Sequence, residues 1–296
     1  MPVVSTGPVV VADSPGKLNV FLEVRGKRPD GYHELETVML RTTFCDRMSF
    51  QLLPTPELRL SLTASTPAEI RGDFPLDQSN LILKAATALQ AETGCRHGAA
   101  IAVHKRIPPQ SGLAGGSGNA ACTLLMLNRL WQAGVAESRL HQLAAELGSD
   151  INFLLSGSRA AVCRGRGELL TPIHVSRPLF FVATRPPQGN STGQVFRQTE
   201  FSDTPESSAG IVQVLSGALQ QPLRNFCFNR LTSSACQLNG LMADLLDQMQ
   251  LHLKQPAFMS GSGSTCFVAA ENHRHAVCLR AGLQGIVPWP VWILRC

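Results

Sequence analysis

Hydrophobic and polar residues alternate along several short segments of the chain, which is typical of strands with one buried face. The alternation predicts strands over residues 17–24, 36–41, 99–105, 159–163, 169–173, 266–270 and 291–294. Residues 179–184 are more continuously apolar, as expected of a central strand. Residues 48–53 and 57–62 surround Pro54 and Pro56, and this pattern predicts a hairpin.

Apolar residues recur at helical spacing elsewhere, and glycine ends several of these segments. The predicted helices cover residues 80–93, 119–132, 137–147, 149–157, 211–219, 229–249 and 273–283. Asn80 is a suitable N-cap for the first helix, and Gly94 is a suitable stop. The polar stretch 185–208 predicts a loop over the active site. This mixed order of strands and helices predicts an α+β fold with a boundary near residues 160–165.

A run rich in glycine and serine, residues 108–121, lies directly before an apolar helical pattern. Such a loop lets a ligand approach the main chain closely, and a helix N-terminus adds unpaired N–H donors and the positive end of a dipole. Together they predict a phosphate site, with a flexible helix-entry loop as the structural alternative. The Walker pattern is absent, because no lysine follows these glycines. Residues 116–121 match the dinucleotide-binding pattern in form, but Pro108 and Pro109 separate them from the nearest predicted strand, which disfavours a Rossmann fold.

Composition narrows the class of protein. The chain has 296 residues, of which 44% are hydrophobic and 16% charged, enough for a large core. The net charge of +5 is dispersed, which disfavours nucleic-acid binding and suits an anionic small-molecule substrate. Nine cysteines without a Cys-x-x-Cys pair favour a reducing compartment over disulfides or zinc. The sequence shows no signal peptide and no membrane-spanning run, so we expect a cytoplasmic protein without a membrane partner.

Several polar residues lie where a reaction could use them, but each has a structural alternative. Asp150 follows Ser149 at the predicted start of a short helix, so it is either a general base or part of a helix cap. Lys17 begins an apolar strand, where a charge is usually solvated. The Asp-Gly-Tyr-His sequence that ends in Tyr32 and His33 is an ordinary turn signal. Local sequence leaves these alternatives open.

Five separated stretches together resemble the GHMP kinases, the family of galactokinase, homoserine kinase and mevalonate kinase. They are Ser14–Leu22, Arg28–Leu35, the glycine run, Leu147–Phe153 and Met259–Phe267. The Asp-Gly-Tyr-His sequence further resembles a subfamily of the non-mevalonate isoprenoid pathway that acts on a cytidine diphosphate-linked sugar alcohol. The resemblance implies an α+β fold of the two-domain GHMP kinase type. It has an N-terminal ATP-binding domain, residues 1–163, a C-terminal substrate-binding domain, residues 164–296, and the active site in the cleft between them.

The same resemblance implies an ATP-dependent kinase that phosphorylates the 2-hydroxyl of this substrate, with Mg²⁺ accompanying ATP. Asp150 corresponds to the general base of the family, and Lys17 to the lysine that stabilises the developing alkoxide. Tyr32 and Phe196 would stack on the two faces of the cytosine, and His33 would hydrogen-bond to it. The residues implied to bind ATP are Asn80, Lys105, Pro109, Gly112, Leu113, Ala114, Gly115, Gly116, Ser117, Gly118 and Asn119. The residues implied to bind the substrate are Asn19, Tyr32, His33, Thr192, Phe196, Gly261 and Ser262.

One position departs from the family pattern. The family usually has two serines after the loop glycines, whereas this chain has Ser117 followed by Gly118. Either Ser117 alone meets phosphate or Mg²⁺, or ATP and water hold most of the metal, so we name no protein metal ligand. Two other functions stay open as alternatives: a GHMP kinase for another small alcohol such as homoserine or mevalonate, and a non-catalytic nucleotide-binding relative.

Overall fold

The structure is a computed structural model that describes residues 9–296. These residues form two compact units whose segments interleave along the chain. Unit 1 consists of the described residues through Gly16, residues 44–109 and residues 114–157, and unit 2 consists of residues 17–43, 110–113 and 158–296. The long strands β1 (Val9–Lys27) and β2 (His33–Leu53) therefore contribute to both units.

Two expectations from the sequence are not tested by this arrangement. Residues 1–8, where we expect no signal peptide, lie outside the described residues. The division into family domains at residues 163 and 164 stays a prediction, because the two compact units are defined by contacts and are not consecutive segments.

In unit 1, strand β4 (Gly98–His104) lies between β2 and β3 (Leu58–Leu62). β4 pairs antiparallel with the end of β2, with Leu53 opposite Gly98, and parallel with β3, with Leu58 opposite Ala99. The predicted hairpin of 48–53 and 57–62 is therefore wrong. The local turn signal was correct, but the apolar strand β4 takes the position between the two segments.

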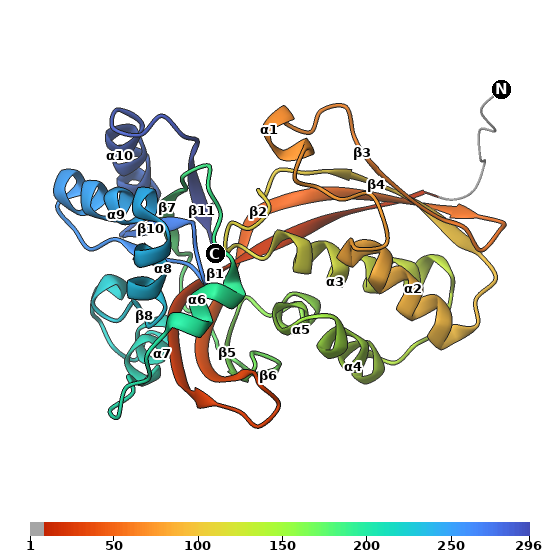
Figure 1. Cartoon of the computed structure of the whole chain (residues 1–296), viewed down its shortest axis with the longest axis horizontal. Coiled ribbons are helices and arrows are strands. Elements are labelled where there is room, and N and C mark those ends of the chain that lie inside the picture. Colours follow the sequence, from red (N-terminus) through yellow and green to blue (C-terminus); the bar gives the residue numbers. More distant parts are fainter. Residues whose placement is uncertain (1–8) are drawn as a thin grey trace. The chain divides into compact units, whose positions relative to one another are not determined.

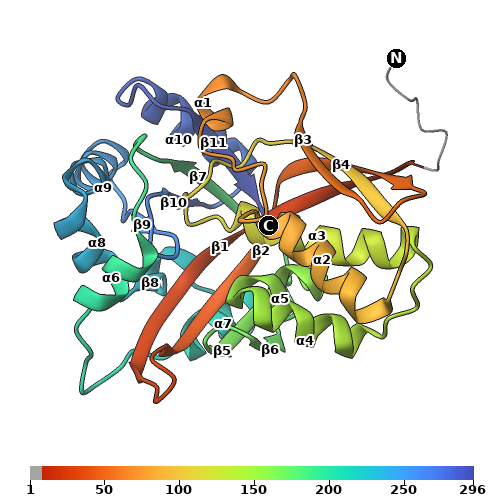
Figure 2. The ribbon, with the colours of Figure 1, turned by 45° about the vertical axis from the view of Figure 1, so that its right-hand side comes forward.

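Four helices of unit 1 lie on one side of β3 and β4, as Figures 1 and 2 show. They are α2 (Leu81–Thr93), α3 (Gly115–Leu130), α4 (Glu137–Leu147) and α5 (Ser149–Leu155), and a short α1 spans Ala68–Arg71. Of these, α4 and α5 pack against α2 and α3. Buried apolar side chains from α2, α3 and β4, such as Leu89, Leu124 and Ile101, form the core of the unit. The Trp131 indole donates a hydrogen bond to the Gly98 carbonyl over 3.2 Å and ties the end of α3 to β4.

The predicted ends of α2 are confirmed, whereas α3 begins earlier than predicted. The Asn80 side chain accepts a hydrogen bond from the Ile82 N–H, and Gly94 ends the helix with φ of +62°. Helix α3 begins at Gly115 instead of residue 119, so the second half of the glycine run 108–121 belongs to the helix itself.

Unit 2 contains the remaining strands. β5 (Ala160–Gly165) pairs antiparallel with β2, β6 (Leu169–Pro172) pairs with β5, and the short β8 (Phe228–Asn229) pairs parallel with β1. A four-stranded sheet follows the order β11 (Val291–Arg295), β7 (Phe180–Thr184), β10 (Cys266–Ala270) and β9 (Phe258–Met259). β7 is an interior strand of this sheet, which confirms the prediction for residues 179–184.

The helices of unit 2 are α6 (Thr192–Gln198), α7 (Ala209–Ser216), η1 (Leu223–Asn225), α8 (Thr232–Leu238), α9 (Gly240–Leu253) and α10 (His273–Gln284). The single predicted helix 229–249 is wrong, since α8 and α9 are separate. Asn239 has φ of −140° and its side chain accepts from the Met242 N–H, so it ends one helix and caps the next. The predicted loop 185–208 likewise contains a helix, α6.

A buried carboxylate fixes the segment that follows α6. Glu23 on β1 is fully buried and accepts two hydrogen bonds from the Arg230 guanidinium, each 2.8 Å long. Its carboxylate also accepts from the backbone N–H of Glu206 over 2.8 Å. Burial alone would raise the pKa of Glu23, but Arg230 and these backbone donors hold it below its usual value. The 199–208 segment is therefore held to β1 by an ionised side chain.

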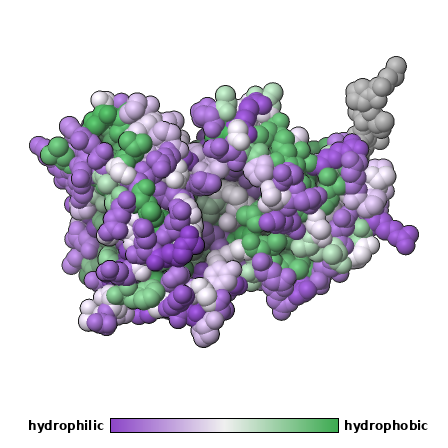
Figure 3. All heavy atoms as spheres, in the orientation of Figure 1, coloured by the Kyte–Doolittle hydropathy of each residue, from purple (hydrophilic) through white to green (hydrophobic). Residues whose placement is uncertain are grey.

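Within residues 9–296, no helix is both long and apolar enough to cross a bilayer. Figure 3 shows hydrophilic and hydrophobic residues interspersed on the face it draws. The nine cysteines, all within the described part of the chain, are free thiols.

Candidate active site

Three segments that are far apart in the sequence meet around Lys17 in unit 2. The Lys17 ammonium group is buried and donates hydrogen bonds to Asn19 Oδ1 and to the Gly112 carbonyl, the latter over 2.8 Å. The Ser260 hydroxyl donates to the same carbonyl over 3.0 Å and accepts from the Asn19 backbone N–H over 3.1 Å. The N-terminal motif, the glycine run and the C-terminal glycine motif therefore share one hydrogen-bond network, and a solvated strand end is the wrong interpretation of Lys17.

Glycines are needed where these motifs touch. A Cβ on Gly261 would lie 3.1 Å from Lys17 Nζ, and Gly261 has φ of +57°, which disfavours other residues. A Cβ on Gly112 would overlap the carbonyl oxygen of Ser260. Both glycine motifs thus come close to the lysine, and Gly112 supplies the carbonyl that accepts from it.

An aromatic cluster forms a second part of unit 2. The His33 ring stacks on Phe196 with centroids 5.0 Å apart and an interplanar angle of 28°, and Phe201 lies 5.8 Å away in a tilted arrangement. Burial, together with the nearby charge of Lys27, lowers the pKa of His33, so its imidazole is neutral at pH 7. Tyr32 is 54% exposed and presents its ring at the surface.

Helix α6 links the aromatic cluster to the C-terminal glycine motif. The Thr192 hydroxyl lies 2.8 Å from the Ser262 hydroxyl, and Phe196, one turn later, stacks on His33. Asn190, just before the helix, donates a 2.9 Å hydrogen bond to the Ser262 carbonyl. A chain of contacts therefore runs from His33 through α6 to the glycine motif whose Ser260 shares the Gly112 carbonyl with Lys17.

In unit 1, the N-terminus of α3 has one open side and one packed side. Its N-cap is Ala114, with φ of +54°, and no side chain of the described residues caps it. A Cβ on Gly116, which is exposed, would have one heavy atom within 4 Å, at 3.8 Å. A Cβ on Gly115 would instead lie 2.7 Å from Lys105 Nζ and 2.8 Å from Ile107 Cγ2. The backbone N–H donors of this turn are thus reachable from the side of Gly116.

Lys105 is fixed behind the helix start by Asp46. The two side chains form an ion pair in which they are 2% and 0% exposed. Asp46 Oδ1 also accepts the backbone N–H groups of Arg106 and Ile107, over 2.7 and 2.8 Å. Burial lowers the pKa of Lys105, and the attraction of Asp46 opposes this shift. The predicted ATP contact of Lys105 is therefore a buried charge directly under the first turn of α3.

Packing explains the departure from the family pattern at position 118. A Cβ on Gly118 would overlap the Pro15 carbonyl oxygen and lie 3.1 Å from Ser14 Oγ, so a serine does not fit this backbone. The next residue, Asn119, is fully buried and donates to Ser14 Oγ over 2.9 Å and to Asp46 Oδ2 over 3.0 Å. Gly118 and Asn119 therefore join α3 to β1 and β2 inside unit 1.

Other predicted ATP contacts have structural partners as well. The Asn80 amide caps α2 and donates to the Pro75 carbonyl over 2.6 Å. The Leu113 carbonyl accepts the Lys17 backbone N–H over 2.9 Å, and the Ala114 carbonyl accepts that of Gly118. Two more predicted contacts, Pro109 and Ser117, are partly exposed. The role of each in ATP binding stays a prediction.

Asp150 is the second residue of α5 and is half-buried. The N-cap of this helix is Gly148, which has no side chain, so Ser149 is the first helical residue and not a cap. A carboxylate in the first turn is favoured by the helix dipole. Asp150 belongs to unit 1 and Lys17 to unit 2, and their action on one hydroxyl stays a prediction. Across residues 9–296 we find no cluster of three or more His, Cys, Asp or Glu side chains that could hold a metal.

Two residues of this arrangement were missed in the sequence. Asp46 lies on β2 on the same face as the buried residues Met48 and Phe50, and it is buried as well. A charged residue at such a position indicates a buried partner. Ser260 was noted only as part of a glycine motif, and no local signal indicates that its hydroxyl reaches Gly112.

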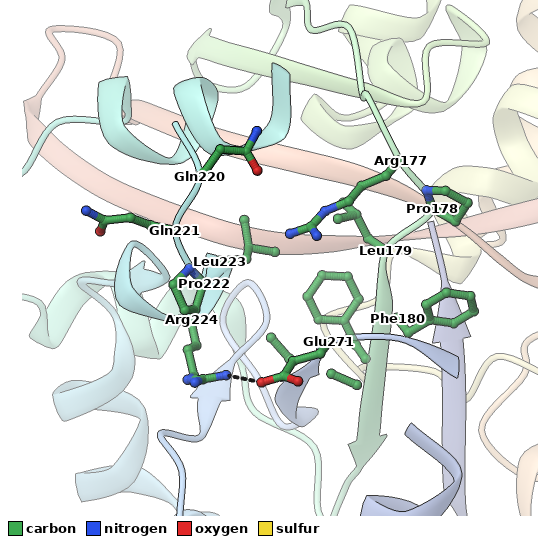
Figure 4. A pocket seen from close by; sticks show the side chains of 13 residues that line it. Arg177, Pro178, Leu179, Phe180, Gln220, Gln221, Pro222, Leu223, Arg224 and Glu271 are labelled. Carbon is green, nitrogen blue, oxygen red and sulfur yellow. Dashed lines mark ion pairs between the residues drawn. The ribbon is translucent and has the colours of Figure 1, made fainter. Parts of the chain in front are cut away.

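A separate pocket of about 340 Å³ lies in unit 2 between β7 and the segment around η1 (Figure 4). Its lining includes Arg177, Phe180, Leu223 and Arg224, and an ion pair of 3.6 Å joins Arg224 to Glu271. None of the residues predicted for ATP or substrate binding lines it. This pocket therefore does not bear on the predicted site.

Comparisons with known proteins agree with the motifs. Residues 80–161 match the model of the GHMP kinases N terminal domain. The chain is 34% identical over 275 residues to the 4-diphosphocytidyl-2-C-methyl-D-erythritol kinase of Shouchella clausii, covering 92% of this chain and 89% of that protein. It is 36% identical over 278 residues to the enzyme of the same name from Geobacillus thermodenitrificans, covering 92% of each.

Solved structures share the fold. A crystal structure of 4-(cytidine 5'-diphospho)-2C-methyl-D-erythritol kinase superposes with a TM-score of 0.78 at 30% identity, covering 97% of this chain and 98% of that one. A homoserine kinase from Cytophaga hutchinsonii superposes with a TM-score of 0.71 at 14% identity, covering 100% and 96%. The second likeness concerns the fold alone, which is the GHMP kinase fold with mixed strands and helices.

Proposed function

Because the chain belongs to the family of 4-diphosphocytidyl-2-C-methyl-D-erythritol kinases, within the GHMP kinases, we propose how its own residues carry out the reaction of that family. The protein is an ATP-dependent small-molecule kinase of the non-mevalonate route to isoprenoid precursors. It transfers the γ-phosphoryl group of ATP to the 2-hydroxyl of 4-diphosphocytidyl-2-C-methyl-D-erythritol.

One observation carries the assignment of the substrate side. In unit 2, the His33–Phe196 stack is followed along α6 by the Thr192–Ser262 pair. Ser260, two residues before Ser262, then shares the Gly112 carbonyl with Lys17. One end of this series is aromatic and the other end carries a buried ammonium group. That order suits a substrate with a nucleobase at one end and a reacting hydroxyl at the other.

The aromatic end is the proposed cytosine subsite. Tyr32 and Phe196 offer ring faces for stacking, which is worth about 1–3 kcal/mol per base. A neutral His33 has one N–H donor and one acceptor nitrogen, so it can read the hydrogen-bonding edge of the base. A wrong base would leave a polar group of this half-buried ring unpaired.

The first turn of α3 is the proposed phosphate cradle. Its N–H groups are uncapped by any side chain of the described residues, and Gly116 leaves the approach open. Lys105 adds a fixed positive charge beneath Gly115. ATP is expected to bring Mg²⁺ with it, and the metal would neutralise part of the negative charge of the phosphates. Ser117, in the same turn, is the residue we propose to face ATP and its metal, and we assign no complete protein ligand set.

Catalysis needs a base and a stabiliser of the attacking oxygen. We assign the role of base to Asp150. It accepts the proton of the 2-hydroxyl while the oxygen of that hydroxyl attacks the γ-phosphorus. The bond to the bridging oxygen breaks and ADP leaves. Lys17, held by Asn19 and the Gly112 carbonyl, stabilises the developing alkoxide. We propose the cytoplasm, which supplies ATP, as the compartment of this activity.

A coupled kinase assay tests the proposal. We expect turnover with 4-diphosphocytidyl-2-C-methyl-D-erythritol and little with homoserine or mevalonate, the substrates of the alternative GHMP kinases. The His33→Ala variant should raise KM for the cytidyl substrate by about tenfold to a hundredfold, from the free energies of stacking and hydrogen bonding. Replacing cytosine by uracil should impair the wild type far more than this variant. Equal activity of wild type and variant on both bases would contradict the cytosine subsite.

A further inference from the structure

The ring of Tyr32, the only tyrosine of the chain, lies under an arginine. The guanidinium carbon of Arg166 is 4.6 Å from the ring centroid, the geometry of a cation–π contact. Tyr32 nevertheless remains 54% exposed. A guanidinium over the ring covers one face, so the exposed area includes the other face.

The fold explains why these two residues meet. Strands β2 and β5 are antiparallel, with Leu35 opposite Gly165, so the turn after β5 lies beside the turn before β2. Gly165 and Gly167, with φ of +70° and +115°, flank Arg166 and turn the chain sharply.

Hydrogen bonds fix the backbone on both sides of the contact. The Gly165 N–H donates to Glu34 Oε1 over 3.1 Å, and the Arg166 N–H donates to Glu168 Oε2 over 2.6 Å. On the other turn, the Tyr32 N–H donates to Asp30 Oδ1 over 3.0 Å. Both backbones are therefore set before any ligand binds, and what is left to fix is the direction of the Tyr32 ring.

We propose that Arg166 is a positioning residue that holds the Tyr32 ring ready to stack on the nucleobase of the substrate. The inference rests on the proposed function, in which Tyr32 is a cytosine platform. An exposed aromatic side chain rotates among several orientations, and ordering it on binding costs affinity. A ring already held on one face loses less freedom when a base stacks on the other.

Enzyme kinetics give the first test. An exposed cation–π contact corresponds to about a two- to fivefold change in an equilibrium constant. We expect Arg166→Gln to raise KM for the cytidyl substrate by that factor, with kcat and KM for ATP unchanged, and Arg166→Lys to restore part of the loss. Arg177→Gln, which removes an exposed arginine elsewhere in unit 2, is the matched control and should leave all three constants unchanged.

A double-mutant cycle separates this role from a structural one. In a Tyr32→Ala background, Arg166→Gln should have no further effect on KM. An equal effect in both backgrounds would overturn the inference and leave the proposed function intact. A Tyr32→Ala enzyme with the wild-type KM would instead overturn the platform role within the proposed function, and the inference with it.

A spectroscopic test does not depend on turnover. Because Tyr32 is the only tyrosine, protein labelled with fluorotyrosine gives one ¹⁹F resonance. We expect Arg166→Gln to shift this resonance in the free enzyme and Arg177→Gln to leave it in place. Cytidine diphosphate should shift the wild-type resonance at lower concentration than that of Arg166→Gln, by the same two- to fivefold factor. An unchanged resonance in Arg166→Gln would overturn the inference whatever the kinetics show.

Discussion

Two adjacent glycines at the start of α3 should respond to the same substitution in opposite ways. Gly116→Ala places a methyl group in open space, where its one neighbour is 3.8 Å away. Alanine is favoured over glycine within a helix by up to about 1 kcal/mol, so the free energy of unfolding without ligand should stay constant or rise. The methyl group does, however, occupy the side from which a phosphate would approach the N–H donors.

The expected loss is in ATP binding. A hydrogen bond to a charged group contributes about 1.5–3 kcal/mol, so removing one raises KM for ATP roughly 10- to 150-fold. KM for the cytidyl substrate should change little. Urea denaturation without nucleotide and initial rates at varied ATP measure the two effects on the same preparation.

Gly115→Ala is the matched control. Its methyl group would lie 2.7 Å from Lys105 Nζ and 2.8 Å from Ile107 Cγ2, and overpacking of this kind costs about 1–3 kcal/mol of stability. Gly115→Ala should therefore destabilise the free protein, whereas Gly116→Ala should not. A wild-type KM for ATP in a stable Gly116→Ala enzyme would refute the phosphate cradle and return this turn to a structural role.

Three further predictions concern single carboxylates. Asp150→Asn should lower kcat by about 10²–10⁴-fold, because a general base contributes that factor, and KM for ATP should stay unchanged. Near-normal turnover of this variant would show that Asp150 is not the base. Asp46→Asn leaves the Lys105 ammonium group buried without a carboxylate partner. Urea denaturation should show that the free energy of unfolding falls by about 3 kcal/mol or more, and a fall below about 1 kcal/mol would contradict the importance of the pair. The pKa of Glu23 is lower in the folded protein than its usual value of about 4.3, so its stabilisation is complete above that pH and is lost as the pH falls through the folded-state pKa. Urea midpoints between about pH 5 and 3 should therefore fall less steeply in Glu23→Gln than in wild type, and parallel curves would contradict the role of the Glu23–Arg230 pair.

The sequence was most informative where local chemistry decides the structure. Asn80 and Gly94 mark the ends of α2 because capping and positive φ depend on neighbouring residues alone. The pairing of β3 with β4 instead of β2 could not be predicted from the sequence. Strand order depends on which segment buries the larger apolar surface in the assembled sheet. The division of α8 from α9 at Asn239 was missed because an apolar pattern continues across a break that a side-chain cap creates.

The candidate site divides in the same way. Resemblance to a family indicated Lys17 and the glycine motifs, but not the network in which Lys17 and Ser260 both donate to the Gly112 carbonyl. Contacts between segments so far apart depend on the whole fold. At Gly118 the sequence raised a question about metal binding, because the family usually has a serine there. The structure explains the glycine by packing, since a side chain at this position would overlap the Pro15 carbonyl oxygen.

The interleaving of the two units has a consequence for synthesis on the ribosome. Phe21 and Leu22 pair with Phe228 and Asn229, which are added to the chain about 200 residues later. At about 5–20 residues per second, this edge of β1 waits roughly 10–40 s for its partner. Leu22 also belongs to an apolar cluster that is completed only by residues near the C-terminus, such as Val291. Throughout that interval the nascent chain carries an unpaired strand edge, which a chaperone or a neighbouring nascent chain can bind.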